Sequence, residues 1–261
     1  MQTNGNYDEF ATIYNEDNER NAYNALYERP ATLALVGAVA GLRVLDAGCG
    51  GGAHAAALVA SGATVTGIDK SQALLAIARE RLGPKISLIR ADLETPLGFA
   101  DQSFDVVLAS LIMHYLRDWQ PVLTEFKRIL APGGRLVMST HHPFMDHLLA
   151  GRTNYFETYE FADQWHKGGR TIHIKYWHRP LRARWKRRCI PGPTSGVDLP
   201  RKAVLRRTKA RLAFICCAAN RPFRLALYGG RAKRQKGWSR NLFRPGASLQ
   251  SLSWLNRCSN K

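Results

Sequence analysis

At 261 residues, 45% of them hydrophobic, the chain is long enough to bury the core of one α/β domain with an appendage. It has no apolar run of about 18 residues and no secretory signal at its start, so we expect a cytoplasmic protein without a membrane span. Its five cysteines show no metal-ligand spacing, so we expect free thiols and no bound metal. The formal net charge of +18 is uneven: residues 1–180 carry 17 basic and 19 acidic side chains, whereas residues 181–261 carry 21 basic and one acidic.

Helical and strand patterns alternate before residue 181. Residues 1–18 are polar and acidic and predict a loose lead-in, and residues 19–39 are helical, with Pro30 either opening a second helix or kinking the first. Strands are predicted at 42–45, 64–68, 86–89, 104–108 and 135–139, and helices at 54–60, 72–82 and 119–130, with Ser71 as the N-cap of the second. Residues 171–177 alternate like a strand at an edge or in a cap.

This alternation predicts a doubly wound, mostly parallel, Rossmann-like sheet with helices on both faces. Asp46, Asp69 and Asp92 end or follow three successive strands, at the edge where open α/β sheets bind ligands. The glycine-rich turn at 48–52 alone also satisfies a dinucleotide-binding fingerprint. Asp46 argues against that alternative, because it adds a third carboxylate to this edge. Three carboxylates suit a cationic ligand that carries an adenosine, whereas they would repel the anionic pyrophosphate of a dinucleotide.

Five segments, in this order and spacing, resemble class I S-adenosylmethionine-dependent methyltransferases, and most closely the small-molecule group that includes quinone-biosynthesis enzymes. They are DAGCGGG, VTGID, ADLE, FDVVLASLIMHYL and LAPGGRLVMSTHHPF, within 23–177. The resemblance implies S-adenosylmethionine as the cofactor. It places Asp46, Gly48 and Gly50 along the methionine part, Asp69 on the ribose, Asp92 and Leu93 beside the adenine and Ser110 at the closing edge, with Lys70 and Tyr27 as further contacts.

These residues also have structural interpretations. Either Asp46 or Asp69 alone is as consistent with capping as with binding, and only the spaced set favours binding; Ser110 is equally consistent with a helix N-cap. An oxygen or nitrogen acceptor benefits from a general base, for which His114, His141 and His142 are the candidates, although packing and capping are alternatives for all three.

The predicted domains are a helical lead-in and cap (1–40), the donor-binding methyltransferase domain (41–180) and a basic tail (181–261). Within the second, the aromatic segment 144–177 resembles a substrate lid and suits an apolar, ring-bearing acceptor. The chain is therefore predicted to methylate a small molecule, and its oligomeric state is not indicated.

The tail has two interpretations. Its 21 positive charges suit a nucleic-acid-binding arm, which gives an RNA-directed methyltransferase as the alternative function. We favour a broken reading frame near residue 182, because the tail mixes tryptophan and cysteine with arginine and lacks an amphipathic period. In that case the sheet lacks its last strands, and a donor-binding but inactive protein is a third alternative.

Overall fold

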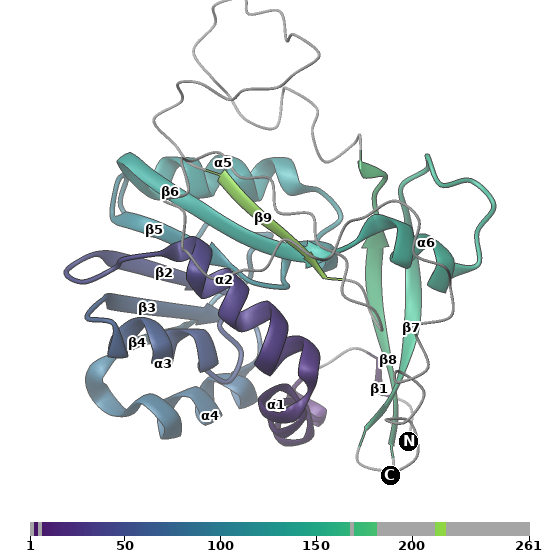
Figure 1. The fold of residues 1–261 in the computed structure, drawn as a ribbon, viewed down its shortest axis with the longest axis horizontal. Helices are drawn as coiled ribbons and strands as arrows, with labels where there is room; N and C mark the ends of the chain where they lie inside the picture. Colours follow the sequence, from purple (N-terminus) through teal and green to yellow (C-terminus); the bar gives the residue numbers. More distant parts are fainter. Residues whose placement is uncertain (1–2, 5–6, 168–169, 182–211, 218–261) are drawn as a thin grey trace, which may run out of the picture. The chain divides into compact units, whose positions relative to one another are not determined.

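The computed structural model of the chain describes residues 3–4, 7–167, 170–181 and 212–217 (Figure 1). Its central sheet is parallel throughout these residues. In spatial order the strands are β4 (Ser87–Arg90), β3 (Thr64–Asp69), β2 (Arg43–Ala47), β5 (Phe104–Ala109), β6 (Leu130–His141) and β9 (Leu212–Cys217). The alternation of strands and helices confirms the predicted Rossmann-like fold.

Helices cover both faces of this sheet because side chains alternate along each strand. Leu45 and Val107 face α5 (Trp119–Ile129), whose buried stripe includes Phe126. On the opposite face Val44 and Val106 pack with residues of α2 (Arg29–Val36) and α3 (Ala53–Ala60). The helix α4 (Gln72–Leu82) begins as predicted at Ser71, whose hydroxyl accepts a hydrogen bond from the Leu74 N–H at 3.1 Å.

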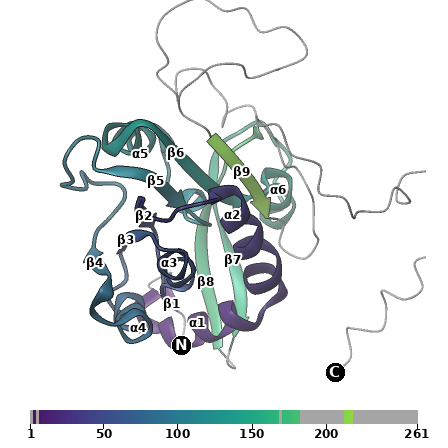
Figure 2. The same cartoon turned by 60° about the vertical axis from the view of Figure 1, so that its left-hand side comes forward.

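A second, three-stranded sheet stands beyond the carboxyl ends of the central strands (Figures 1 and 2). Its order is β1 (Thr3–Asn4), β8 (Arg170–His178) and β7 (Tyr159–Lys167), with β7 antiparallel and β1 parallel to β8. The helix α6 (Pro143–Ala150) connects it to β6. We call these strands the cap sheet. Because β8 is its middle strand, the edge interpretation of residues 171–177 is wrong, and their role as a cap stays a prediction.

The prediction of a loose lead-in is wrong for residues 7–18. A 3-10 turn, η1 (Tyr7–Glu9), leads into α1 (Ala11–Arg20), and Phe10 is buried against Ile172, Ile174 and Tyr176 of the cap sheet. A π-helical segment, η2 (Ala22–Glu28), follows, and Pro30 opens α2 rather than kinking one long helix. Tertiary contacts, which composition does not reveal, order this segment.

The basic tail lies outside the described residues except for Leu181 and β9, so its two interpretations and the domain boundaries stay predictions. The strand β9 pairs in parallel with β6 from Leu136↔Leu212 to His141↔Cys217. Within the described part of the chain, no antiparallel strand joins the central sheet, no helix is long and apolar enough to cross a membrane, and no cluster of three or more metal-binding side chains is present.

Candidate functional site

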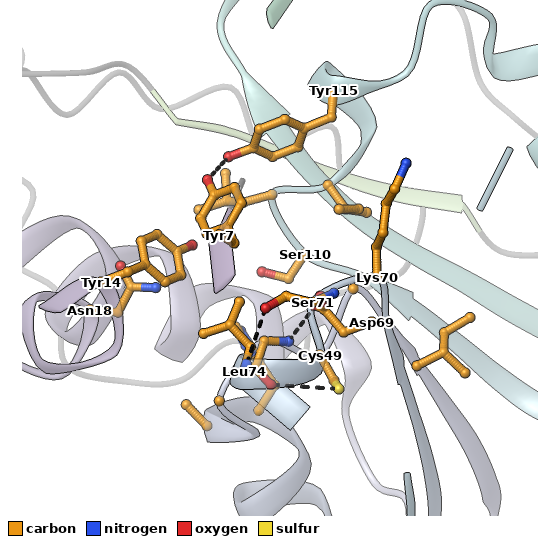
Figure 3. A pocket seen from close by; sticks show the side chains of 18 of the residues that line it. Tyr7, Tyr14, Asn18, Cys49, Asp69, Lys70, Ser71, Leu74, Ser110 and Tyr115 are labelled. Carbon is orange, nitrogen blue, oxygen red and sulfur yellow. Dashed lines mark hydrogen bonds between the residues drawn. The ribbon is translucent and has the colours of Figure 1, made fainter. Parts of the chain in front are cut away.

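A cavity of about 540 Å³ lies at the carboxyl ends of β2, β3, β4 and β5, where the strands give way to loops (Figure 3). The cavity brings together most of the residues that the sequence singled out for cofactor binding: Gly48, Gly50, Asp69, Lys70, Asp92, Leu93 and Ser110. Asp46 and Tyr27 do not line it. Its volume falls in the range of small-molecule sites.

The glycine-rich loop after β2 requires glycine for two reasons. Gly48 and Gly50 have φ angles of +76° and +54°, which side-chain-bearing residues rarely adopt, and a Cβ on Gly48 would lie 2.8 Å from Cγ1 of Ile112. A Cβ on Gly50 would meet no atom within 4 Å, although Gly50 lines the cavity. The loop therefore presents bare backbone to open space, which allows a ligand to approach closely.

Asp69 fastens this loop to the start of α4. Its Oδ2 accepts a hydrogen bond from the Gly50 N–H at 2.8 Å, and its Oδ1 accepts one from the Ser71 N–H at 2.9 Å. Burial raises the pKa of Asp69, while these backbone N–H groups oppose the rise. Beside it, Lys70 Nζ lies 2.6 Å from Asp92 Oδ2, which links the ends of β3 and β4 at the rim.

Asp46 lies behind the loop, which corrects the expectation that it contacts the ligand. Only 1% of its surface is exposed, because it lies in the buried stretch of β2, one residue before the strand ends at Ala47. Burial raises its pKa to about 6; His54 opposes this rise, and the nearby carboxyls of Asp69 and Glu28 add to it. Asp46 therefore contributes to the electrostatics of the site without lining it.

We expect Asp46→Asn to remove part of the pH dependence of stability. The folded protein holds a proton on Asp46 that the unfolded chain, with its ordinary pKa of 3.8, releases, so wild-type stability should fall as pH rises from about 4 to about 6. Urea unfolding at pH 4, 5, 6 and 7 measures this trend. A variant whose stability follows pH as the wild type does would contradict the assignment.

Glu28, at the end of η2, is a site residue that sequence reasoning missed. It lines the cavity with 1% of its surface exposed, and its Oε1 accepts hydrogen bonds from the hydroxyls of Thr32 (2.7 Å), Ser110 (2.7 Å) and Ser139 (2.6 Å). Its Oε2 lies 3.3 Å from Nε2 of His54. Burial alone would raise the pKa of Glu28, but these partners, His54 first, lower it to about 2.

The loop after β5 is strained where it meets the cavity. Leu111 has a φ of +48°, an unusual conformation for a branched side chain. Its N–H donates to both the carbonyl oxygen (3.2 Å) and the hydroxyl (2.9 Å) of Ser139. Because Ser139 also donates to Glu28, this strained loop and the N-terminal helices are fixed by one polar network.

The N-terminal turn η1 forms another wall of the cavity. Asp8 Oδ1 accepts hydrogen bonds from the Ser71 hydroxyl (2.5 Å) and the Ala73 N–H (2.9 Å), which caps α4 from outside its own segment. The hydroxyl of the neighbouring Tyr7 forms a hydrogen bond with that of Tyr115, and both residues line the cavity (Figure 3). With Tyr14, these two rings make one wall aromatic.

The three candidate base residues do not line the cavity. His114 is buried and stacks on His141 with ring centroids 3.7 Å apart, and His141 Nδ1 lies 3.3 Å from Asp146 Oδ1. His142 caps α6 by accepting a hydrogen bond from the Phe144 N–H at 3.3 Å. The positions of His114 and His141 near strand ends correctly suggested that they lie close to the site, but neither lines the cavity. Tyr115, which packs on His114, lines it instead.

Comparisons with known proteins agree with this arrangement. Residues 45–138 match the family described as "Methyltransferase domain". A demethylmenaquinone methyltransferase of Clavibacter sepedonicus is 37% identical over 140 residues, which are 52% of this chain and 57% of that protein. A ubiquinone biosynthesis O-methyltransferase of Vibrio atlanticus is 34% identical over 114 residues, covering 42% and 48%.

The fold has a counterpart among solved structures. A putative S-adenosylmethionine-dependent methyltransferase from Listeria monocytogenes superimposes with a TM-score of 0.51 and 24% identity, covering 60% of this chain and 76% of that one. The chain spans about half the length of the curated relatives it matches. The matched segment runs from Leu45 in β2 to Met138 in β6 and contains the glycine-rich loop. Residues 45–138 therefore match a methyltransferase domain in sequence, and the fold around them has a counterpart in a solved structure.

Proposed function

We propose that this chain transfers a methyl group from S-adenosylmethionine to a small-molecule acceptor. The observation that carries the proposal is the cavity, in which a bare glycine loop lies beside the partly buried carboxylate of Asp69. Its neighbours suit each part of the donor: Asp69 the ribose hydroxyls, Asp92 and Leu93 the adenine, and Gly48 with Ser110 the methionine part. The bound donor supplies an electrophilic methyl group, and the protein orients the acceptor and excludes water.

Arg29 supports this orientation of the donor. It lines the cavity and donates hydrogen bonds to Glu19 Oε2 and to the Asn18 carbonyl oxygen, both at 3.1 Å. Its Nε is buried and has no hydrogen-bond partner among the described residues. A guanidinium held this way is suited to bind a carboxylate, so we assign it to the carboxylate of the donor's amino-acid end.

The aromatic wall of Tyr7, Tyr14 and Tyr115 supports an acceptor site next to the donor. Such rings attract a sulfonium through their faces and offer an apolar surface to a ring-bearing acceptor. His114 packs on Tyr115 and stacks on His141, so both histidines keep a proposed role only through Tyr115. In this role they position the ring of Tyr115, whereas His142 caps α6.

A small-molecule acceptor is favoured over RNA because the similar proteins named above act on quinone precursors by their printed names. The basic residues that suggest RNA lie at 182–261, outside the described residues except for 212–217. The cytoplasmic location also stays a prediction from the sequence.

Calorimetric titration with S-adenosylmethionine and its demethylated product, S-adenosylhomocysteine, tests the proposal. Wild type should bind both, and Asp69→Ala should lower the affinity by about 1–3 kcal/mol, because ribose contacts and the anchor of the Gly50 N–H are lost. The matched control is Asp105→Ala, which removes a carboxylate paired with Arg43 at the start of β5 and should leave binding unchanged. Absence of binding by wild type would sink the proposal.

A further inference from the structure

We propose that Glu28 binds the α-ammonium of the donor, so that Glu28 and Arg29 together recognise a zwitterionic amino-acid end. The inference rests on the proposed function and adds a specificity-determining residue to it. Both residues line the same cavity, although they are consecutive in the chain. They meet at the junction of η2 and α2, where the helical winding changes from π to α. One cation and one anion side by side match the carboxylate and ammonium of an α-amino acid.

The carboxylate of Glu28 is fixed before any ligand arrives. Its Oε1 holds three hydroxyls from three separate segments: Thr32 on α2, Ser110 after β5 and Ser139 on β6. A side chain tied in this way has little rotamer freedom left to lose on binding, which favours affinity. Because Ser110 lines the cavity too, the fixed carboxylate lies beside the methionine end of the proposed donor site.

The second oxygen of Glu28 has capacity for another donor group. A carboxylate offers about four lone-pair sites over its two oxygens. Within the described part of the chain, the polar contact of Oε2 is with His54 Nε2 at 3.3 Å. An ammonium can therefore share Oε2 with the imidazole, without displacing the hydroxyls that hold Oε1.

The surrounding charges favour a cation at this position. The carboxyls of Asp69 and Glu28 raise the pKa of Asp46, and those of Glu28 and Asp46 raise the pKa of His54, so three carboxyls lie in or close behind the cavity near His54. Burial weakens screening by water, so a cationic group gains more from these carboxylates here than at the surface. A ligand without the ammonium leaves that negative charge uncompensated.

A cycle of two proteins and two ligands tests this assignment. The proteins are wild type and Glu28→Gln, whose amide oxygen can still accept the three hydroxyls. The ligands are S-adenosylhomocysteine and its des-amino analogue, the 3-carboxypropyl thioether of adenosine, which differ only in the ammonium. Wild type should prefer the amino compound by about tenfold or more, as expected for a charge-assisted hydrogen bond. Glu28→Gln should lose this preference while binding the des-amino compound as wild type does.

Glu125→Gln is the control, because it makes the same exchange at a carboxylate that pairs with Arg128 on α5, outside the cavity lining. It should retain the preference for the amino compound. Equal weakening of both ligands by Glu28→Gln, or an unchanged preference, would overturn the assignment and leave Glu28 a purely structural residue. Failure of wild type to bind either ligand would instead refute the proposed function. Thermal unfolding of each variant verifies that it is folded.

Discussion

Replacing Gly48 by alanine is expected to weaken donor binding by about ten- to hundredfold, or about 1–3 kcal/mol. The new Cβ would lie 2.8 Å from Cγ1 and 3.0 Å from Cβ of Ile112. Ile112 has little room to withdraw, because it follows the strained Leu111, whose N–H is held by Ser139. The loop must shift instead, and its bare backbone would no longer fit the donor. Calorimetry with S-adenosylhomocysteine measures the loss.

Gly83→Ala is the matched control for this substitution. Gly83 has a similar φ of +62°, but a Cβ there meets no atom within 4 Å and lies at the end of α4, away from the cavity. Both glycines have a positive φ that alanine rarely adopts, so each variant should be destabilised and stability does not separate them. Donor affinity separates them. An equal loss of affinity in both variants would mean that backbone strain causes it, and would contradict a role for the clash with Ile112.

Phe126→Ala is expected to destabilise the fold by about 3–5 kcal/mol, because it leaves a cavity in the core. Phe126 is fully buried on α5 and packs in the cluster that also contains Leu45, Val107 and Met138 from three central strands. A loss of this size is a large share of the stability of an ordinary domain. Urea unfolding followed by circular dichroism measures it.

Lys127→Ala, one residue further along α5, is the control because Lys127 is exposed. Its effect should stay within about 0.5 kcal/mol. A Phe126→Ala variant no less stable than Lys127→Ala would mean that α5 does not cover the sheet as described. Donor binding by folded Phe126→Ala should be close to that of wild type, since Phe126 does not line the cavity.

Local patterns were sufficient to predict five of the six strands that the structure describes in the central sheet, and three of its helices. Strands such as β2 and β5 are short, mostly apolar runs bounded by turn residues, a signal carried by neighbouring residues alone. Ser71 was predictable for the same reason, since a cap is chosen by the residues that follow it. The acids at strand ends predicted where the cavity lies, because parallel strands place their carboxyl ends at one edge.

Glu28 and the N-terminal turn were not predictable in this way. Ser110 and Ser139, which hold Glu28, lie 82 and 111 residues away in the sequence, so nothing near Glu28 indicates that its carboxylate is buried and fixed. Asp8 caps α4 across 63 and 65 residues, and the polar composition around it shows no helical period. Tertiary contacts decide both positions.

The histidines show a different limit. A strand-end position predicts the edge of the sheet at which a side chain lies, but it does not predict which neighbour comes between that side chain and the ligand. Tyr115 takes the lining position beside His114, and Asp146 on α6 pairs with His141. Packing of the cap on the central domain determines this order, and packing is not visible in a linear pattern.

The pairing of Thr3 and Asn4 with Ile172 and His173 bears on how the protein matures during translation. Residues 3–10 leave the ribosome long before β8, so η1 and Phe10 have no cap-sheet partners while five central strands emerge. Domains fold as their segments become available, and a parallel pairing this distant in sequence forms late. The contacts between Phe10 and the cap sheet can therefore form only after residue 178 has left the exit tunnel, which happens before β9 emerges.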